Sequence, residues 1–330
     1  MNRTALIAIG GNSLIRAGEA GSVTEEQERA QATSRAIVQL VADGWNVLVT
    51  HGNGPQVGAE LLRSERGAGE VYALPLHVCV ANTQGEIGYL LQQAIRQQLA
   101  ARRLARPVAT VLTQVIVSAE DPAFARPTKP IGPSYSREEA DLKCARLGWT
   151  MVEDARGGFR RVVASPEPLE IVEEDVIRTL LKAGVLVIAL GGGGIPVARE
   201  QDRLTGIEAV VDKDRASALL ASRLGVDLFV ISTDVDRVYL DYRRPNQRPL
   251  GLVTVDELER YRREAHFPPG SMGPKIEAAL RFLREGGREV VITSPARIPH
   301  AVRGRGGTHI VSTTNLRAAR RAAVAAGSRA

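Results

Sequence analysis

Apolar residues along the chain gather in short continuous runs, and these runs alternate with longer stretches of helical character. Runs that are apolar throughout are typical of strands buried on both faces of a parallel sheet. We therefore predict strands at residues 4–9, 45–50, 107–116, 185–190, 226–232, 289–293 and 308–312. Helices are predicted at residues 24–43, 55–66, 75–102, 173–183, 213–224, 254–264, 274–285 and 316–326. This alternation indicates an α/β protein whose largely parallel sheet is covered on both faces.

Residues 121–168 interrupt the alternation. Prolines mark both ends of this segment, and its interior carries only short apolar pieces such as the one in residues 160–164. We interpret the segment as a small inserted subdomain, which contains Lys129.

Glycine-rich turns follow three of the predicted strands, at the ends where active sites of open α/β sheets lie. The first turn contains Gly10, Gly11 and Asn12. Its glycines would let the backbone approach a ligand closely, but an ordinary tight turn from a strand into a helix also explains the motif. The second turn, His51 to Gln56, has Pro55 at the start of a helix, which leaves backbone amides free for an oxyanion. His51 itself is better explained as a structural, hydrogen-bonded histidine than as a catalytic group.

The third turn is a run of four glycines from Gly191 to Gly194. Such a run costs backbone entropy, so we expect a ligand to approach it closely. Two carboxylates, Asp234 and Asp236, follow the next predicted strand. They fit contacts to a ribose, the orientation of lysines or the capping of a turn equally well.

Lysine is rare in this chain, since its 43 lysines and arginines comprise five lysines and 38 arginines. Three of the lysines, Lys129, Lys213 and Lys275, nevertheless stand at turns marked by glycine, proline or aspartate. A biased genome composition is one explanation. The other is chemical, because Lys213 and Lys275 fall in the first turns of predicted helices, where free backbone N–H groups attract anions. Two such helix ends indicate a site for a polyphosphate or a transferring phosphoryl group.

The residue before Lys213 is Asp212, which begins the same predicted helix. Aspartate at this position commonly caps a helix. Its place beside a lysine also suits a residue that holds ammonium groups, and the sequence leaves both roles open.

Composition narrows the classes of partner. The chain of 330 residues forms one large domain or two ordinary ones, and its net charge of +6 is compatible with anionic substrates. Basic residues are not interleaved with aromatic ones as in nucleic-acid binders, so we expect no nucleic-acid partner. No apolar run is long enough for a membrane span, no leader precedes the first strand, and Cys79 and Cys144 lack metal-ligand spacing. We expect a cytoplasmic protein with no membrane partner and no metal held by its own side chains.

Several enzyme classes are disfavoured because their motifs are missing from the sequence. There is no P-loop, no protein-kinase motif set and no nucleophile elbow of the Gly-x-Ser-x-Gly type.

Eight motifs, in order along the chain, resemble those of carbamate kinases within the amino acid kinase superfamily. They span residues 10–12, 51–58, 83–93, 127–132, 191–197, 211–214, 233–236 and 270–275. The Gly-Gly-Asn turn and the Asp-Lys pair are shared widely in the superfamily. The insert motif Pro-Thr-Lys-Pro-Ile-Gly and the motif Gly-Ser-Met-Gly-Pro-Lys are more specific to carbamate kinases.

The resemblance implies a three-layer α/β/α sandwich with a central eight-stranded, mostly parallel sheet and an inserted lid subdomain. It implies an N-terminal carbamate-binding lobe at residues 1–172 and a C-terminal nucleotide-binding lobe at residues 173–330. The implied reaction is reversible phosphoryl transfer between ATP and carbamate, with Mg²⁺ bound to ATP or ADP, in a homodimer with a place in arginine metabolism.

The resemblance also implies roles for individual residues. The catalytic set is Lys129, Lys213, Lys275, Asp212 and Asn12. The substrate-binding set is Gly10, Gly11, Gly52, Asn53 and Gly54. The nucleotide-binding set is Gly191, Gly192, Gly193, Asp234, Tyr239 and Met272.

Three positions depart from the family pattern. Ser13 stands where alanine is common, His77 where we expect an acidic residue, and Glu86 where an apolar residue is more usual. Two functions other than that of a carbamate kinase stay open. One is a kinase of the same fold that acts on another carboxylate or phosphate, and the other is a nucleotide-binding regulator without catalysis. The insert argues against the first alternative, and the three retained lysines argue against the second. The direction of the reaction in the cell is left open.

Overall fold

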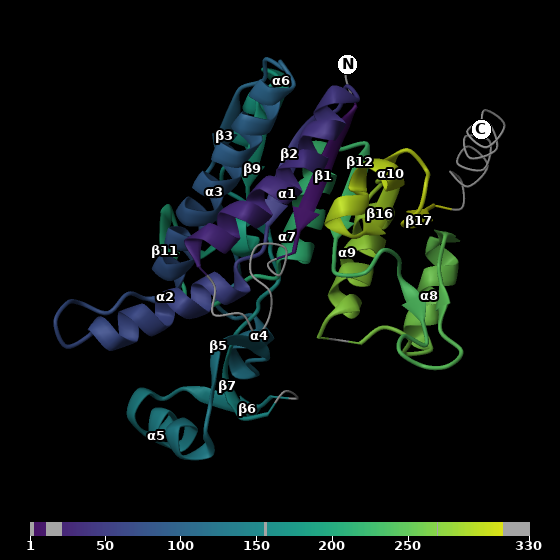
Figure 1. Ribbon diagram of the computed structural model, residues 1–330. Helices are drawn as coiled ribbons and strands as arrows, with labels where there is room; N and C mark the ends of the chain where they lie inside the picture. The colour runs from purple at the N-terminus through teal and green to yellow at the C-terminus, as the bar shows by residue number, and fades with distance from the viewer. Residues whose placement is uncertain (1–2, 11–21, 155–156, 269, 313–330) are drawn as a thin grey trace.

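The computed structural model describes residues 3–10, 22–154, 157–268 and 270–312. Gly11, Asn12, Ser13 and the predicted helix 316–326 lie outside the described residues. The central sheet has eight strands and confirms the predicted fold class (Figure 1). In spatial order they are β15 (Leu252–Thr254), β17 (Thr308–Val311), β16 (Glu289–Thr293), β12 (Leu228–Ser232), β1 (Thr4–Ile9), β2 (Asn46–His51), β9 (Leu186–Ala189) and β3 (Val108–Thr110).

The six strands from β16 to β3 all run parallel. The direction changes once, because β17 pairs antiparallel with β16, and β15 then runs parallel to β17. The sheet is therefore mostly parallel, and the carboxyl ends of its central strands meet at one edge.

Side chains of the central strands alternate between two apolar cores. In β1, Ala5, Ile7 and Ile9 belong to one core, whereas Leu6 and Ala8 belong to the other. This explains why the strand is apolar at every position from Ala5 to Ile9.

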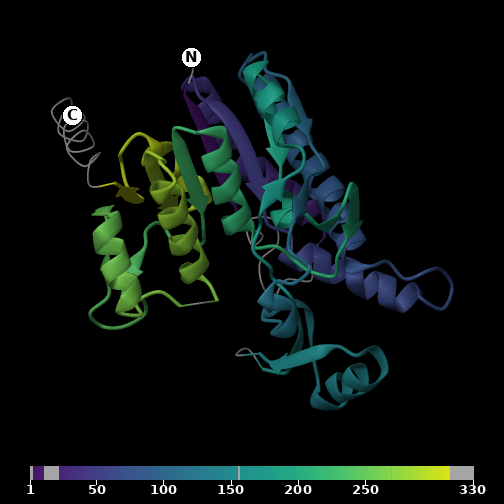
Figure 2. The same ribbon diagram turned by 180° about the vertical axis from the view of Figure 1, so that it is seen from behind.

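One helical layer covers each core. The helices on the face toward the viewer in Figure 1 are α1 (Val23–Ala42), α3 (Leu76–Ala101) and α10 (Ile298–Val302). The other core is closed by α6 (Glu174–Lys182), α7 (Lys213–Leu224), α8 (Val255–Arg263) and α9 (Met272–Arg284). Figure 2 shows α7 and α9 side by side from behind.

The predicted strand 107–116 is wrong as a single element. It forms two strands, β3 and β4 (Gln114–Ile116), that belong to different sheets. The break lies at Thr113, whose hydroxyl donates to the carbonyl oxygen of Val111 (2.7 Å) and accepts the N–H of Leu190 (3.0 Å). The second sheet places β4 between β8 (Glu170–Ile171) and β10 (Ile195–Glu200), with β11 (Arg203–Gly206) at its edge.

The predicted insert has a sheet of its own and projects from the central sheet beside α2 (Gly54–Gly67) (Figure 1). Its elements are α4 (Pro122–Ala125), β5 (Lys129–Tyr135), α5 (Arg137–Leu147), β6 (Thr150–Glu153) and β7 (Phe159–Val163). Asp121 accepts the backbone N–H of Glu167 at 2.9 Å, which ties the two ends of the insert together.

Short elements complete the described chain. They are the 3₁₀ helices η2 (Gly191–Gly193) and η3 (Pro295–Arg297), and the hairpin of β13 (Tyr239–Leu240) and β14 (Arg248–Pro249). Among the described residues, no helix combines the length and the apolar character that a membrane span requires.

Candidate functional site

The predicted glycine turns meet at the carboxyl edge of the central sheet. Neighbouring strands β12, β1, β2 and β9 end there, and each is followed by one of the segments that the sequence marks as functional. Gly10 follows β1, and the N–H of Gly52 donates to the carbonyl oxygen of Ile9 at 2.9 Å. Gly191–Gly193 follows β9, so strands far apart in sequence bring these turns together.

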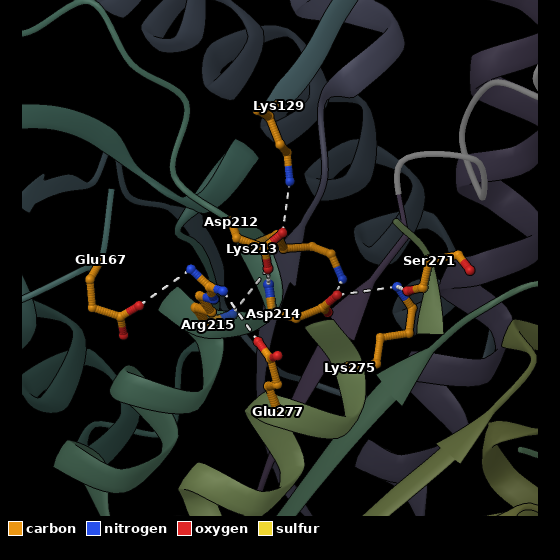
Figure 3. A network of polar contacts seen from close by, with 9 residues as sticks. All are labelled: Lys129, Glu167, Asp212, Lys213, Asp214, Arg215, Ser271, Lys275 and Glu277. Carbon is orange, nitrogen blue, oxygen red and sulfur yellow. Dashed lines mark hydrogen bonds and ion pairs between the residues drawn. The ribbon is translucent and has the colours of Figure 1, made fainter. Parts of the chain in front are cut away.

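Three lysines from three different elements converge above this edge, as Figure 3 shows. Lys129 of β5 donates to Asp212 Oδ2 at 2.7 Å. Lys213 of α7 donates to Asp214 Oδ1 at 2.6 Å, and Lys275 of α9 donates to Asp214 Oδ2 at 3.2 Å. The structure therefore brings together all three predicted catalytic lysines.

Asp212 fills both roles that the sequence leaves open. As the N-cap of α7, its Oδ1 accepts the N–H groups of Asp214 (2.9 Å) and Arg215 (3.3 Å), which satisfies donors that a helix start leaves free. Its second oxygen remains available for Lys129. One carboxylate thus fixes the start of α7 and receives the lysine of the insert.

Asp214 belongs to the lysine cluster, although the sequence analysis gave it no role of its own. Its side chain is only 5% exposed and lies between two ammonium groups. The signal in the sequence is weak, because an acidic residue in the first turn of a helix is ordinary. The signal that could have revealed Asp214 is its position directly after Lys213, in a chain with a second helix that carries a lysine in its first turn.

Charges in this cluster do not cancel. Three ammonium groups face two carboxylates, which leaves one net positive charge. Burial favours the neutral form of Asp214, but Lys213 and Lys275 outweigh burial and hold the pKa of Asp214 well below its usual value. Burial likewise works against the charge of Asp212, and Lys129 keeps the pKa of Asp212 lowered.

The pKa values of the two lysines that share Asp214 are shifted in opposite directions. Burial lowers the pKa of Lys213, because Asp214 offsets it only in part and Lys275 adds a second positive charge. For Lys275 burial is outweighed by Asp214, so the pKa of Lys275 is raised. Lys213 is therefore the ammonium group that gains most from an additional anion.

A second row of charges braces the helices beneath the lysines (Figure 3). Arg215 of α7 lies 3.2 Å from Glu277 of α9, two residues beyond Lys213 and Lys275 respectively. Glu167, at the end of the insert, pairs with both Arg215 (3.5 Å) and Arg281 of α9. The insert is thus attached to the same two helices that carry the lysines.

The turn after β2 is built from neutral, buried groups. Asn53 is 3% exposed and donates through Nδ2 to Thr83 Oγ1 at 2.9 Å. His51 is 1% exposed, and its Nδ1 lies 3.1 Å from the carbonyl oxygen of Gly52. Burial lowers the pKa of His51 to about 4, so the imidazole is neutral. This agrees with the structural role that the sequence favours.

The run of glycines after β9 packs against the protein itself. A Cβ on Gly191 would lie 2.6 Å from the His51 ring, and one on Gly192 would lie 2.2 Å from Asn53 Nδ2. A Cβ on Gly193 would lie 2.4 Å from the carbonyl oxygen of Val211. Gly192 and Gly193 also have positive φ angles of 67° and 91°, which favour glycine. Close packing against the chain thus explains these glycines, and their nucleotide-binding role stays a prediction.

Gln84 of α3, which the sequence analysis did not single out, completes this turn. Its amide donates to the carbonyl oxygens of Thr113 (3.1 Å) and Gly191 (2.9 Å) and accepts the N–H of Thr113 (2.8 Å). No local pattern predicts these contacts, because the partners lie 29 and 107 residues away.

The predicted nucleotide residues lie on the side of β12 and α9. Asp234 is close enough to Lys275 for its charge to help raise the pKa of that lysine. Met272 is the first residue of α9, one turn before Lys275. Tyr239 lies in the β13–β14 hairpin, with its ring centre 5.8 Å from that of Tyr242. The backbone oxygen of Asp236 accepts the hydroxyl of Thr293 at 3.2 Å.

The arrangement suits a phosphorylated ligand. Flexible ammonium groups and two helix starts provide positive charge that can follow an anion. In the part of the chain that the structure describes, no group of three or more histidine, cysteine or acidic residues has the arrangement of a metal site.

Comparisons with known proteins agree on one family. The model of the amino acid kinase family matches residues 3–294. The carbamate kinase of Thermococcus kodakarensis is 47% identical over 93% of this chain and 98% of its own length. The carbamate kinase-like protein YahI of Escherichia coli is 46% identical over 95% of this chain and its full length. The structure of carbamate kinase from Giardia lamblia bound to AMP-PNP superposes with a TM-score of 0.89 at 41% identity, and covers 94% of this chain and 99% of its own.

Proposed function

The chain belongs to the amino acid kinase family and has the function of a carbamate kinase, and from this premise we propose how its residues divide the work. The reaction transfers a phosphoryl group reversibly between ATP and carbamate. In this proposal Lys129, Lys213 and Lys275 neutralise the phosphates and follow the moving phosphoryl group.

A single observation carries the proposal: three ammonium groups share two buried carboxylates. Asp212 and Asp214 hold the lysines near the edge of the sheet. An incoming polyphosphate supplies the charge that the cluster lacks, so each lysine exchanges a carboxylate oxygen for a phosphate oxygen. This preorganised positive charge is what phosphoryl transfer requires, because the transition state spreads negative charge over the phosphoryl oxygens.

On the acceptor side, the turn after β2 lies at the start of α2. Gly52, Asn53 and Gly54 would hold carbamate with Gly10, Gly11 and Asn12, and the free N–H groups at the start of α2 would face its charge. Carbamate is already an anion, so the acceptor needs no strong general base. The neutral His51 nearby fits this requirement, since it adds no competing charge.

On the donor side, Asp234, Tyr239 and Met272 would lie near the nucleoside, and Gly191, Gly192 and Gly193 would border the phosphates. Lys129 would reach the phosphoryl group from the insert, which would act as a lid over the site. Residues 1–172 would form the carbamate lobe and residues 173–330 the nucleotide lobe.

Mg²⁺ would enter with the nucleotide. Asp212 and Asp214 are engaged by lysines, so the residues present fit a metal held by phosphate oxygens and water rather than by a protein cage. When bound, the ion would supply positive charge that offsets the negative charge of the phosphates. We further propose a cytoplasmic homodimer with a place in arginine metabolism.

The direct test measures ATP formation from ADP, Mg²⁺ and fresh carbamoyl phosphate, with acetyl phosphate as the control for loose specificity. We expect rapid, Mg²⁺-dependent turnover that is selective for carbamoyl phosphate. Tight ADP binding without turnover of carbamoyl phosphate would contradict the proposal and would favour a kinase that acts on another carboxylate or phosphate.

A further inference from the structure

A buried acid lies directly behind the acceptor turn. Glu26 of α1 is 4% exposed, and Gln56 of α2 is 3% exposed. Gln56 Nε2 donates to Glu26 Oε1 at 3.1 Å. Gln56 is the third residue of α2, one helical turn beyond Asn53, so the pair connects the start of α1 with the start of α2.

Both side chains leave one oxygen without a partner. Glu26 Oε2 and Gln56 Oε1 are buried and accept no hydrogen bond from the described residues. Buried acceptors without donors are rare, because burial removes the water that would otherwise bind them. A proton on Glu26 Oε2 turns that atom into a donor, and the carboxamide oxygen of the same partner is the acceptor that lacks one. A carboxylic acid and a carboxamide have matching donor and acceptor edges.

The surrounding charges also favour the protonated acid. Burial raises the pKa of Glu26, and the charge of Glu86 on α3 raises it further. From α2, the hydrogen bond of Gln56 and the charge of Arg63 act in the opposite direction. Arg63 is 67% exposed and lies 3.3 Å from Glu60, so solvent and Glu60 weaken its effect. The net shift of the Glu26 pKa is upward.

We propose that Glu26 holds a proton in the active enzyme and that the neutral Glu26–Gln56 pair positions the first turn of α2 for the anionic substrate. The inference rests on the proposed function, since it takes the start of α2 as the acceptor site. Loss of the proton would leave a buried negative charge against Gln56, which lies one helical turn beyond Asn53. That charge would repel the substrate anion and remove the donor to Gln56. Substrate binding would accordingly be linked to retention of the proton.

The experiment compares the KM for carbamoyl phosphate in the wild type and in Glu26→Gln from about pH 5 to about pH 8. Glutamine stays neutral and still offers an N–H donor to Gln56 Oε1, so its KM should follow only the titration of the substrate. The titration of the substrate cancels in the ratio of the wild-type KM to the Glu26→Gln KM. We expect this ratio to rise about fivefold as the pH is raised. In Glu86→Gln the rise should begin at lower pH, because removal of the neighbouring charge makes Glu26 easier to ionise.

The matched control is Glu28→Gln, which makes the same change at an exposed position of α1 and should reproduce the wild-type curve. Calorimetry in two buffers of different ionisation enthalpy gives a second readout. The wild type should take up protons when it binds carbamoyl phosphate at the upper end of this pH range, and Glu26→Gln should take up fewer. A constant KM ratio together with equal proton uptake would overturn the inference. A wild type that binds ADP but does not turn over carbamoyl phosphate would instead overturn the proposed function.

Discussion

Two halves of the site meet at the edge of the sheet and are built on opposite principles. The half that we propose holds the acceptor uses neutral groups, namely His51 and Asn53, which pack so tightly against the glycines after β9 that a Cβ on Gly191 or Gly192 would collide with them. The half that we propose holds the donor uses charged groups, with three lysines distributed over two carboxylates. The neutral half is fixed by shape, whereas the charged half can exchange partners without moving its backbone. A phosphoryl group that moves between a small fixed acceptor and a large nucleotide needs both.

The largest effect should come from removing a cation from the charged half. Lys213→Ala and Lys275→Ala should each lower kcat for ATP formation by about 10³-fold, since each removes a preorganised charge from the transition state. The folded structure should persist, as circular dichroism would check. Lys182→Ala, at an exposed position near the end of α6, is the control and should keep its activity. Near-wild-type turnover in either site variant would show that its lysine has another role.

Removing the shared carboxylate should affect stability rather than only activity. Asp214→Asn leaves two buried ammonium groups without their common partner, which should lower the free energy of unfolding by about 3 kcal/mol in anion-free buffer. Inorganic phosphate should restore part of this loss, so the rise in Tm on adding phosphate should be larger than in the wild type. Asp141→Asn, on the exposed side of α5, should change neither quantity. An equal response to phosphate in all three proteins would mean that phosphate does not take the place of the Asp214 carboxylate.

A methyl group added at Gly192 should disrupt the packing of the neutral half. Gly192→Ala combines a positive φ of 67° with a Cβ only 2.2 Å from Asn53 Nδ2, and we expect a loss of about 2–3 kcal/mol and a raised KM for carbamoyl phosphate. Gly44→Ala is a matched control, because Gly44 has a φ of 86° but no atom within 4 Å of an added Cβ. It should show the cost of backbone strain alone, with an unchanged KM. Equal KM values in both variants would mean that the glycine turn does not contribute to binding of carbamoyl phosphate.

Acid should place a charge in the neutral half. The pKa of His51 falls from 6.5 in an unfolded chain to about 4 when folded, so the unfolded state binds the extra proton between these values. The contribution of neutral His51 is complete above pH 6.5 and is lost as the pH falls toward about 4. Chemical denaturation at about pH 5 and about pH 7 should show a difference of about 2 kcal/mol that is absent from His51→Gln. The same slope in both proteins would assign the acid sensitivity to other groups.

Local sequence pattern predicts those parts of the fold that depend on neighbouring residues. Strand β1 matches its prediction because its side chains from Ala5 to Ile9 all face an apolar core. The two ends of α7 follow from its N-cap, Asp212, and from Gly225, which ends the helix with a φ of 63°. The segment 107–116 misleads because its apolar character continues through a break that Thr113 makes by bonding to Leu190.

The site shows the same limit. Lysines at capped helix starts can be recognised from sequence, since local chemistry makes them unusual. Gln84 and Asp214 cannot be recognised as easily, because their importance depends on which distant segments the fold brings beside them. The pairing of Glu26 with Gln56 likewise appears only when α1 and α2 are placed together.

The hydrogen bond between Asp121 and Glu167 has a consequence for how such a protein can change over time. Because the two ends of the insert lie side by side, the central sheet can close beneath it whatever lies between them. The insert is in this sense a module, which can be lengthened, shortened or exchanged while the strands that carry the chemistry keep their order. Its links to α7 and α9 through Glu167 mean that an exchanged module that keeps this residue still arrives next to Lys213 and Lys275.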